Sequence, residues 1–174
     1  GFSSDSGLVG NIVVENTNFD IMDWPRDLKE FAKGRSFRGA GQTARLQLEP
    51  GTEVMRGRFD FREPYLLDQP IGFSWGIYYF GRDRGPYEEE RIGMKWGFDH
   101  RFEEGLLKDW TAGVDFRTEV VKISDLEFLP AKDIREAKGN TYLSSVEPWL
   151  VHNTTDNVFN PTKGHKFRVG WEQY

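Results

Sequence analysis

The 174-residue sequence contains no cysteine, so disulfide frameworks, cysteine metal sites and thiol nucleophiles are absent from it. It also lacks any run of roughly 18 consecutive apolar residues, which excludes a membrane-spanning helix. Basic residues are not in excess: the net charge is -5, and basic and acidic residues alternate along the chain. The electrostatic footprint of a nucleic-acid-binding protein is therefore missing, and we expect no nucleic-acid partner.

The composition combines two properties that rarely occur together. Hydrophobic residues make up only 37% of the chain and the mean hydropathy is -0.64, yet aromatic residues reach 15%. A β-barrel in a bilayer has this composition because alternate residues face lipid and a polar lumen, while aromatic girdles mark both interfaces. The length fits a single domain covering residues 1–174. Because the sequence begins at Gly1 without a charged and apolar leader, we expect a mature or excised piece.

Period-2 alternation is the strongest signal in the sequence, and it predicts antiparallel β-strands. In residues 55–62, for example, Met55, Gly57, Phe59 and Phe61 alternate with three arginines and an aspartate. We expect eight strands of about 9 to 12 residues, close to the ~9–11 that cross a bilayer at a tilt. The alternating residues that mark these strands lie within 8–16, 44–49, 55–62, 71–80, 92–99, 112–120, 141–153 and 166–172. Pro148 lacks a ladder donor, so its strand should be irregular there.

The two faces of these strands differ in kind. The expected lipid-facing residues are Phe59, Phe61, Phe73, Trp75, Trp96, Phe98, Phe116 and Trp171. The expected lumen-facing residues are Arg45, Arg56, Arg58, Asp60, Arg62, Lys95, Asp99, Asp115, Arg117 and Arg168. So many charges cannot form a dry core, because each unpaired buried charge costs several kcal/mol. The polar face must meet water or form a paired network.

Other architectures remain open on the alternation alone. The charged face could be the outside of a soluble antiparallel sheet whose aromatic face is the core. A complete eight-stranded barrel with a structural role, closed by residues 167–174, is another alternative. A third is a soluble lipocalin-like protein that binds an apolar ligand. Two loop helices are also expected: one capped by Asp23 and ending at Gly34, the other spanning residues 130–138.

No pattern in the sequence indicates catalysis, a cofactor or a metal. Gly39, Gly41 and Ala44 formally fit a dinucleotide-binding pattern, but they precede an alternating strand instead of opening a helix. The three histidines have no metal-ligand spacing, and no serine lies in a nucleophile elbow. We therefore expect a protein that is not an enzyme and has no cofactor.

Four ordered motifs resemble the BamA-like outer-membrane protein assembly factors. Gly7-Leu8-Val9-Gly10 with Asn18-Phe19-Asp20 resembles the first barrel strand of that family, and residues 37–42 resemble the start of the second. Residues 61–66 resemble the third strand and its Pro-Tyr loop, and residues 153–157 with 160–164 resemble the hairpin into the eighth. Since the family barrel has sixteen strands, the resemblance implies its N-terminal half. The POTRA domains, the Arg-Gly-Phe/Tyr loop motif and the closing strands of the family are not in this sequence.

The resemblance also implies a function. In the family, the first barrel strand pairs poorly with the last and provides a template for client strands through its backbone groups. It implies outer-membrane localisation, with membrane lipid, unfolded outer-membrane proteins and accessory assembly proteins as partners. A secretion pore of the same superfamily is the alternative within this reading. The templating edge would comprise Val9, Gly10, Asn11, Ile12, Val13, Val14 and Glu15.

Overall fold

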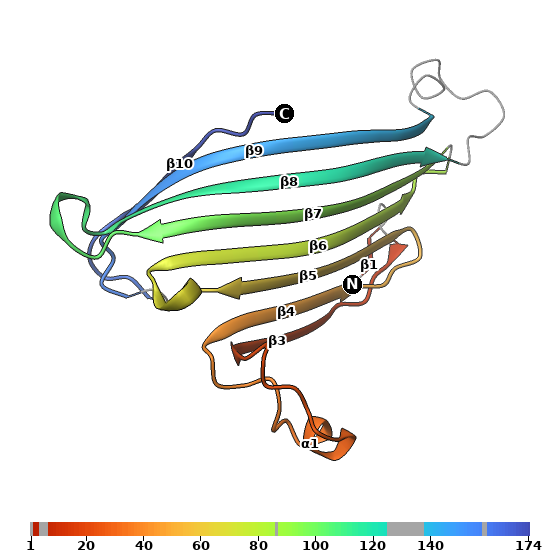
Figure 1. Cartoon of the computed structure of the whole chain (residues 1–174). Helices are drawn as coiled ribbons and strands as arrows, with labels where there is room; N and C mark the ends of the chain where they lie inside the picture. The colour runs from red at the N-terminus through yellow and green to blue at the C-terminus, as the bar shows by residue number, and fades with distance from the viewer. Residues whose placement is uncertain (1, 4–6, 86, 125–137, 158–159) are drawn as a thin grey trace.

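A single antiparallel sheet dominates the computed structural model, which describes all residues except 1, 4–6, 86, 125–137 and 158–159 (Figure 1). Its strands are β3 (Ile12–Phe19), β4 (Gln42–Glu49), β5 (Val54–Glu63), β6 (Ile71–Asp83), β7 (Glu88–Arg101), β8 (Trp110–Ser124), β9 (Gly139–Asn153) and β10 (Lys166–Gly170). The short strands β1 (Phe2–Ser3) and β2 (Gly7–Leu8) form a separate pair. The all-β class expected from the alternation is confirmed.

The eight strands follow one another in a meander, so each pairs with its neighbours in sequence. β3 and β10 lie at opposite edges, and the described strands form an open, curved sheet (Figure 1). A complete eight-stranded barrel would require β3 to pair with β10, so that alternative is wrong. The architecture is that of part of a larger barrel.

The sheet has no compact core. The accessible surface is 12563 Å², whereas a compact 20.2 kDa monomer exposes about 8,800 Å². Among the described residues, the buried hydrophobic side chains are Ala44, Val54 and Phe61. A soluble sandwich or a lipocalin-like binder would cover its aromatic face with a second layer or enclose it in a barrel, and neither occurs in the described part of the chain. Both alternatives are therefore wrong.

The strand lengths differ from the expected range. β6 to β9 contain 13 to 15 residues, whereas the edge strands β3 and β10 contain 8 and 5. β9 runs unbroken against β8 past Pro148, contrary to the expected irregularity. The break falls on the β10 side, where Trp171 N–H donates to Pro148 O at 3.1 Å but Pro148 has no N–H to return the bond. Regular pairing of β10 ends at Gly170 for this reason.

The first loop helix is confirmed, but it is shorter than expected. It is α1 (Leu28–Ala32), and the chain turns at Gly34, whose φ is 62°. Asp27, and not Asp23, caps it by accepting a hydrogen bond from Glu30 N–H at 2.7 Å. The helix expected over residues 130–138 lies outside the described residues, apart from residue 138. Two 3₁₀ turns, η1 (Leu66–Asp68) and η2 (Gly105–Leu107), complete the loops.

Side chains on the polar face reach across glycines to partners two strands away. Tyr78 on β6 crosses Gly93 on β7 and donates its hydroxyl proton to Glu119 on β8 at 2.6 Å. Arg62 on β5 likewise crosses β6 to Asp99 on β7, with both hydrogen bonds 2.9 Å long. Because a side chain on the intervening strand would block these contacts, the glycines allow three strands to be linked at once.

We predict that Gly93→Ala destabilises the sheet by about 1–3 kcal/mol, because the Tyr78–Glu119 hydrogen bond cannot form beside a methyl group. A Cβ at position 93 would lie 2.3 Å from Tyr78 Cζ. Gly57→Ala on β5 is the matched control, since its Cβ would meet only Leu48 Cδ2 at an ordinary 3.6 Å. Urea unfolding of the detergent-solubilised protein measures both free energies, and equal values contradict the prediction.

The loop between β9 and β10 is organised around one carboxylate. Asp156 accepts hydrogen bonds from the Thr162 hydroxyl at 2.6 Å, Thr162 N–H at 2.9 Å and Lys163 N–H at 3.1 Å. These bonds favour the ionised form, led by the Thr162 hydroxyl, and lower the pKa of Asp156 to about 2. The carboxylate thus ties Thr162 and Lys163 to the strand end that precedes the loop.

This loop should loosen in acid. The folded pKa of about 2 lies below the ordinary Asp value of about 3.9, so the stabilisation is present above pH ~4 and is lost as the pH falls toward 2. Titration of the Asp156 carboxyl carbon shift by NMR should give a midpoint near the lower value. A midpoint near 3.9 would show that the three hydrogen bonds do not form in solution.

Candidate functional site

The apolar side chains form rows that cross the sheet on one face. In one row Phe61, Trp75, Trp96 and Phe116 lie directly opposite one another on β5 to β8. Two further rows place Phe59 beside Ile77, and Phe73 beside Phe98 with ring centroids 5.0 Å apart. The backbone N–H of Trp171 donates to Pro148 O, and this places Trp171 at the end of the row that contains Phe73 and Phe98. All eight residues predicted to face lipid thus share one face.

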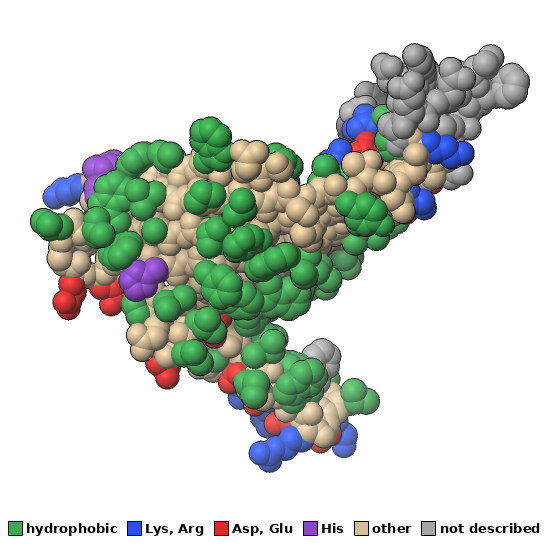
Figure 2. Space-filling view, turned by 45° about the horizontal axis from the view of Figure 1, so that its top comes forward, with side chains coloured by type: hydrophobic (Ala, Val, Ile, Leu, Met, Phe, Trp, Pro, Cys, Tyr) green, Lys and Arg blue, Asp and Glu red, His purple; other side chains and the backbone are tan. Residues whose placement is uncertain are grey.

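This apolar face has defined ends. On β8 it runs from Ala112 to Val120, nine residues or ~30 Å along the strand. A tilt of ~40° reduces this length to ~23 Å, close to the ~25 Å band of outer-membrane barrels. One end is marked by an ion pair between Lys122 and Glu90 at 2.8 Å. The other is marked by Trp110, which stacks on His152 at 4.6 Å. Figure 2 shows hydrophobic side chains over the sheet and charged ones toward its ends.

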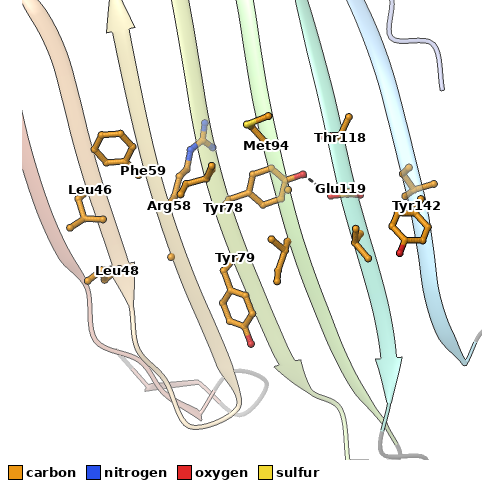
Figure 3. A pocket seen from close by; sticks show the side chains of 16 residues that line it. Leu46, Leu48, Arg58, Phe59, Tyr78, Tyr79, Met94, Thr118, Glu119 and Tyr142 are labelled. Atoms are coloured by element: carbon orange, nitrogen blue, oxygen red, sulfur yellow. Dashed lines mark hydrogen bonds between the residues drawn. The ribbon is translucent and has the colours of Figure 1, made fainter. Parts of the chain in front are cut away.

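The apolar face is hollowed near its middle. A depression of about 680 Å³ lies over β4 to β9, and Gly57 and Thr118 contribute little side-chain bulk to it. Its apolar lining includes Leu46, Leu48, Phe59, Ile77, Met94 and Val120 (Figure 3). Tyr79, Thr118 and Tyr142 also line it, but the surface exposed in it is mainly apolar, so it fits hydrocarbon chains better than a polar substrate.

The opposite face carries the ten residues predicted to face the lumen, and ion pairs connect them. Each of the seven cations has a carboxylate oxygen within 4.0 Å. The pairs are Arg45–Glu15, Arg56–Glu49, Arg58–Asp60, Arg62–Asp99, Lys95–Asp115, Arg117–Glu172 and Arg168–Glu147. Two hollows of about 410 and 480 Å³ lie on this face. The charges therefore form a paired network and not a uniform field.

Sequence reasoning missed two contacts on this face. The hydrogen bond between Tyr78 and Glu119 was not expected, because the two residues lie two strands apart. Trp149 lies over Gly113 on the polar face, with the Arg168 guanidinium 4.6 Å from its ring centroid. Glycines spaced through the polar faces were the available signal for both contacts.

β3 is the exposed edge of the sheet. Of the strands in the described part of the chain, β4 alone is its neighbour in the sheet, and the exposed side chains of β3 include Ile12, Val13 and Val14 at 54%, 43% and 60%. Thr52 N–H donates to Leu8 O, and Gly10 N–H donates to Pro50 O. These two bonds show that the even-numbered residues on this side of the ladder form the hydrogen-bonded pairs. By that alternation Ile12 and Val14 hydrogen-bond β4, while Val13 and Glu15 present their backbone groups to the open side.

The predicted edge segment needs a correction. Val9, Gly10 and Asn11 precede β3, which begins at Ile12 and extends to Phe19. Val9 forms an isolated bridge to Gly51. Pairing shifts register between Asn16 and Phe19, so the edge contains an irregularity near its end. The open strand edge is therefore Ile12–Phe19, and it overlaps the expected segment from Ile12 to Glu15.

No helix in the described ranges is long and apolar enough to cross a membrane. The described residues also contain no group of three or more metal-ligating side chains.

Comparison with known families identifies this arrangement. The Omp85 superfamily domain model matches residues 36–174, most of the chain. The chain belongs to the Omp85 superfamily. The match supports an outer-membrane β-barrel assignment for the described sheet.

A solved Omp85-type structure has the same fold. The crystal structure of BamA from Haemophilus ducreyi lacking POTRA domains 1-3 matches with a TM-score of 0.55 at 14% identity. The match covers 97% of this chain and 31% of that BamA chain. No curated protein sequence matches. At this identity the likeness concerns the fold: an Omp85 barrel segment.

We predict that Trp96→Arg destabilises the protein in lipid vesicles by roughly 2–4 kcal/mol, because an arginine near mid-membrane loses its hydration. Gln47→Arg on the polar face is the control, since the new guanidinium would lie beside Glu49. Unfolding free energies in vesicles compare the two variants. Equal tolerance of both arginines would contradict a hydrocarbon environment for the apolar face.

Proposed function

We propose that this chain forms part of an outer-membrane barrel that templates the folding and insertion of client β-barrel proteins along β3. The single observation that carries the proposal is the open side of β3, where Val13 and Glu15 direct backbone donors and acceptors away from the sheet. An incoming strand could continue the ladder there. The apolar face would meet lipid, and the charged face would look into an aqueous lumen.

The composition of β3 supports its role as an edge that pairs with an incoming strand. Natural edge strands are commonly blunted by proline, lysine or inward charges to prevent association. β3 has the sequence IVVENTNF, with Glu15 as its one charged residue and no proline. Glu15 pairs with Arg45 on the neighbouring strand at 3.5 Å. Because its charge is partly neutralised there, it does little to prevent another strand from pairing with the open side.

The other edge of the sheet is less suited to templating. β10 has 5 residues, and its pairing is interrupted opposite Pro148. In a sixteen-stranded barrel β10 would pair with a further strand, leaving β3 at the seam. The partners proposed are membrane lipid, unfolded outer-membrane clients and accessory assembly proteins. The mechanism requires no catalytic side chain, because backbone hydrogen bonds supply the template.

We predict that a photo-crosslinker replacing Val13 in the full-length protein captures a β-barrel client during its assembly. Ser74 on β6 is the matched control, because it lies on the same polar face but inside the sheet. Capture at both positions, or capture only of the protein's own last strand at position 13, would count against templating by β3.

A pair of proline variants sharpens this test. Val13→Pro should slow client assembly about tenfold while β3 stays paired with β4, since it removes one outward backbone donor worth ~1 kcal/mol and adds a ring on the open side. Val14→Pro should instead detach β3 from β4. If Val13→Pro assembles clients at the unmodified rate, the open backbone of β3 is not the template.

A further inference from the structure

The loop between β3 and β4, residues 20–41, projects from the end of the sheet and carries α1 (Figure 1). It exposes large apolar side chains to an unusual degree: Met22 is 80% exposed, Trp24 70% and Leu28 86%. Client templating by β3 makes no use of these side chains. They require a separate explanation, because exposed apolar groups gathered in one segment mark interaction surfaces.

An aromatic column joins this loop to the apolar face of the sheet. Phe61 belongs to the row that contains Trp75 and Trp96, and its ring meets Phe19 at 6.3 Å. Phe19 stacks on Phe37 in the loop at 5.4 Å, and Phe37 contacts Trp24 at 5.3 Å. The apolar face thus continues beyond the strand ends into the loop.

The column is held in place by the backbone. Phe37 adopts a left-handed conformation with φ of 56°, which is uncommon for a bulky residue. Its N–H donates to Asp23 O at 2.7 Å, and its C=O accepts from Asn16 Nδ2 at 3.3 Å. These bonds offset the unfavourable conformation and present Trp24 in one orientation.

The acidic and the basic side chains of the loop have different environments. Its four acidic side chains all accept hydrogen bonds from backbone N–H groups of the same loop, at 2.7 to 3.3 Å. They are Asp20, Asp23, Asp27 and Glu30. Its five basic side chains are exposed, and among the described residues none forms an ion pair. They are Arg26, Lys29, Lys33, Arg35 and Arg38.

This division contrasts with the polar face of the sheet, where every predicted lumen-facing cation has a carboxylate partner. In the loop the carboxylates organise the backbone, and the cations are available to an external anion. Exposed tryptophan, methionine and leucine beside unpaired lysine and arginine form the pattern of segments that lie in a membrane interface.

We propose that residues 20–41 form an interfacial anchor that binds an anionic lipid surface, with Trp24 and Leu28 at the acyl boundary and the basic side chains on lipid phosphates. The inference rests on the proposed membrane position of the sheet. The anchor would fix the end of the template strand β3 at the bilayer surface, where Phe19 links the two.

The test uses the full-length protein reconstituted in phosphatidylcholine vesicles with or without phosphatidylglycerol. An environment-sensitive fluorophore is attached at Leu28→Cys, and nitroxide-bearing lipids quench it. We expect quenching about twofold stronger with phosphatidylglycerol. The variant K29Q/K33Q/R35Q should remove this difference.

A second loop at the same end of the sheet supplies the control. Leu106, which is 102% exposed, lies between β7 and β8 beside Glu103 and Glu104. A label at Leu106→Cys should show no response to anionic lipid. Equal responses at both positions, or quenching at position 28 that is independent of phosphatidylglycerol, overturns the proposal. A response that requires added client protein would assign the loop to protein binding and also overturns it.

A third label separates this inference from the membrane assignment itself. Met94→Cys lies on the apolar face of β7 and should be quenched in both kinds of vesicle. If position 94 is quenched and position 28 is not, the anchor alone is wrong. If position 94 is not quenched, the membrane position of the sheet fails, and the anchor fails with it.

Discussion

The whole structure depends on the burial of one apolar face that has no protein partner in the described chain. Phe61, Trp75, Trp96 and Phe116 form a continuous row on that face, while ion pairs cover the other. Water on both sides would leave the aromatic rows exposed to solvent. Hydrocarbon on both sides would leave the charged side chains without hydration. An outer-membrane barrel wall satisfies both faces at once, as membership of the Omp85 superfamily requires.

Stability is distributed unevenly across the sheet, and this distribution bears on function. β6 to β9 are 13 to 15 residues long and are linked across glycines by Tyr78–Glu119 and Arg62–Asp99. The edge strand β3 has 8 residues, one paired side and a register shift near Phe19. β6 to β9 thus form the more extensively paired centre of the sheet, and β3 is its weakly held edge. This arrangement would let β3 open locally, as proposed, while the centre of the sheet remains intact.

The alternation predicted the faces because the period of a strand fixes which side chains share a side. The residues expected to face lipid share one side of the sheet, and those expected to face the lumen share the other. Strand ends were harder to predict, since β7 continues through Glu88–Glu90, where the ladder persists although the hydrophobic pattern stops. Val9–Asn11 read as strand but precede β3. The Tyr78–Glu119 bond depends on the register of three strands, which no local pattern encodes.

The most direct measurement of the two-faced wall is the accessibility of single spin labels placed along β7 of the protein in vesicles. Labels at Ile92, Met94, Trp96 and Phe98 should be relaxed by oxygen dissolved in hydrocarbon. Labels at Lys95 and Asp99, on the other face of β7, should be relaxed by a water-soluble nickel complex, so that the two reagents report alternate positions along the strand. A uniform profile, or one with the two faces exchanged, would contradict the account.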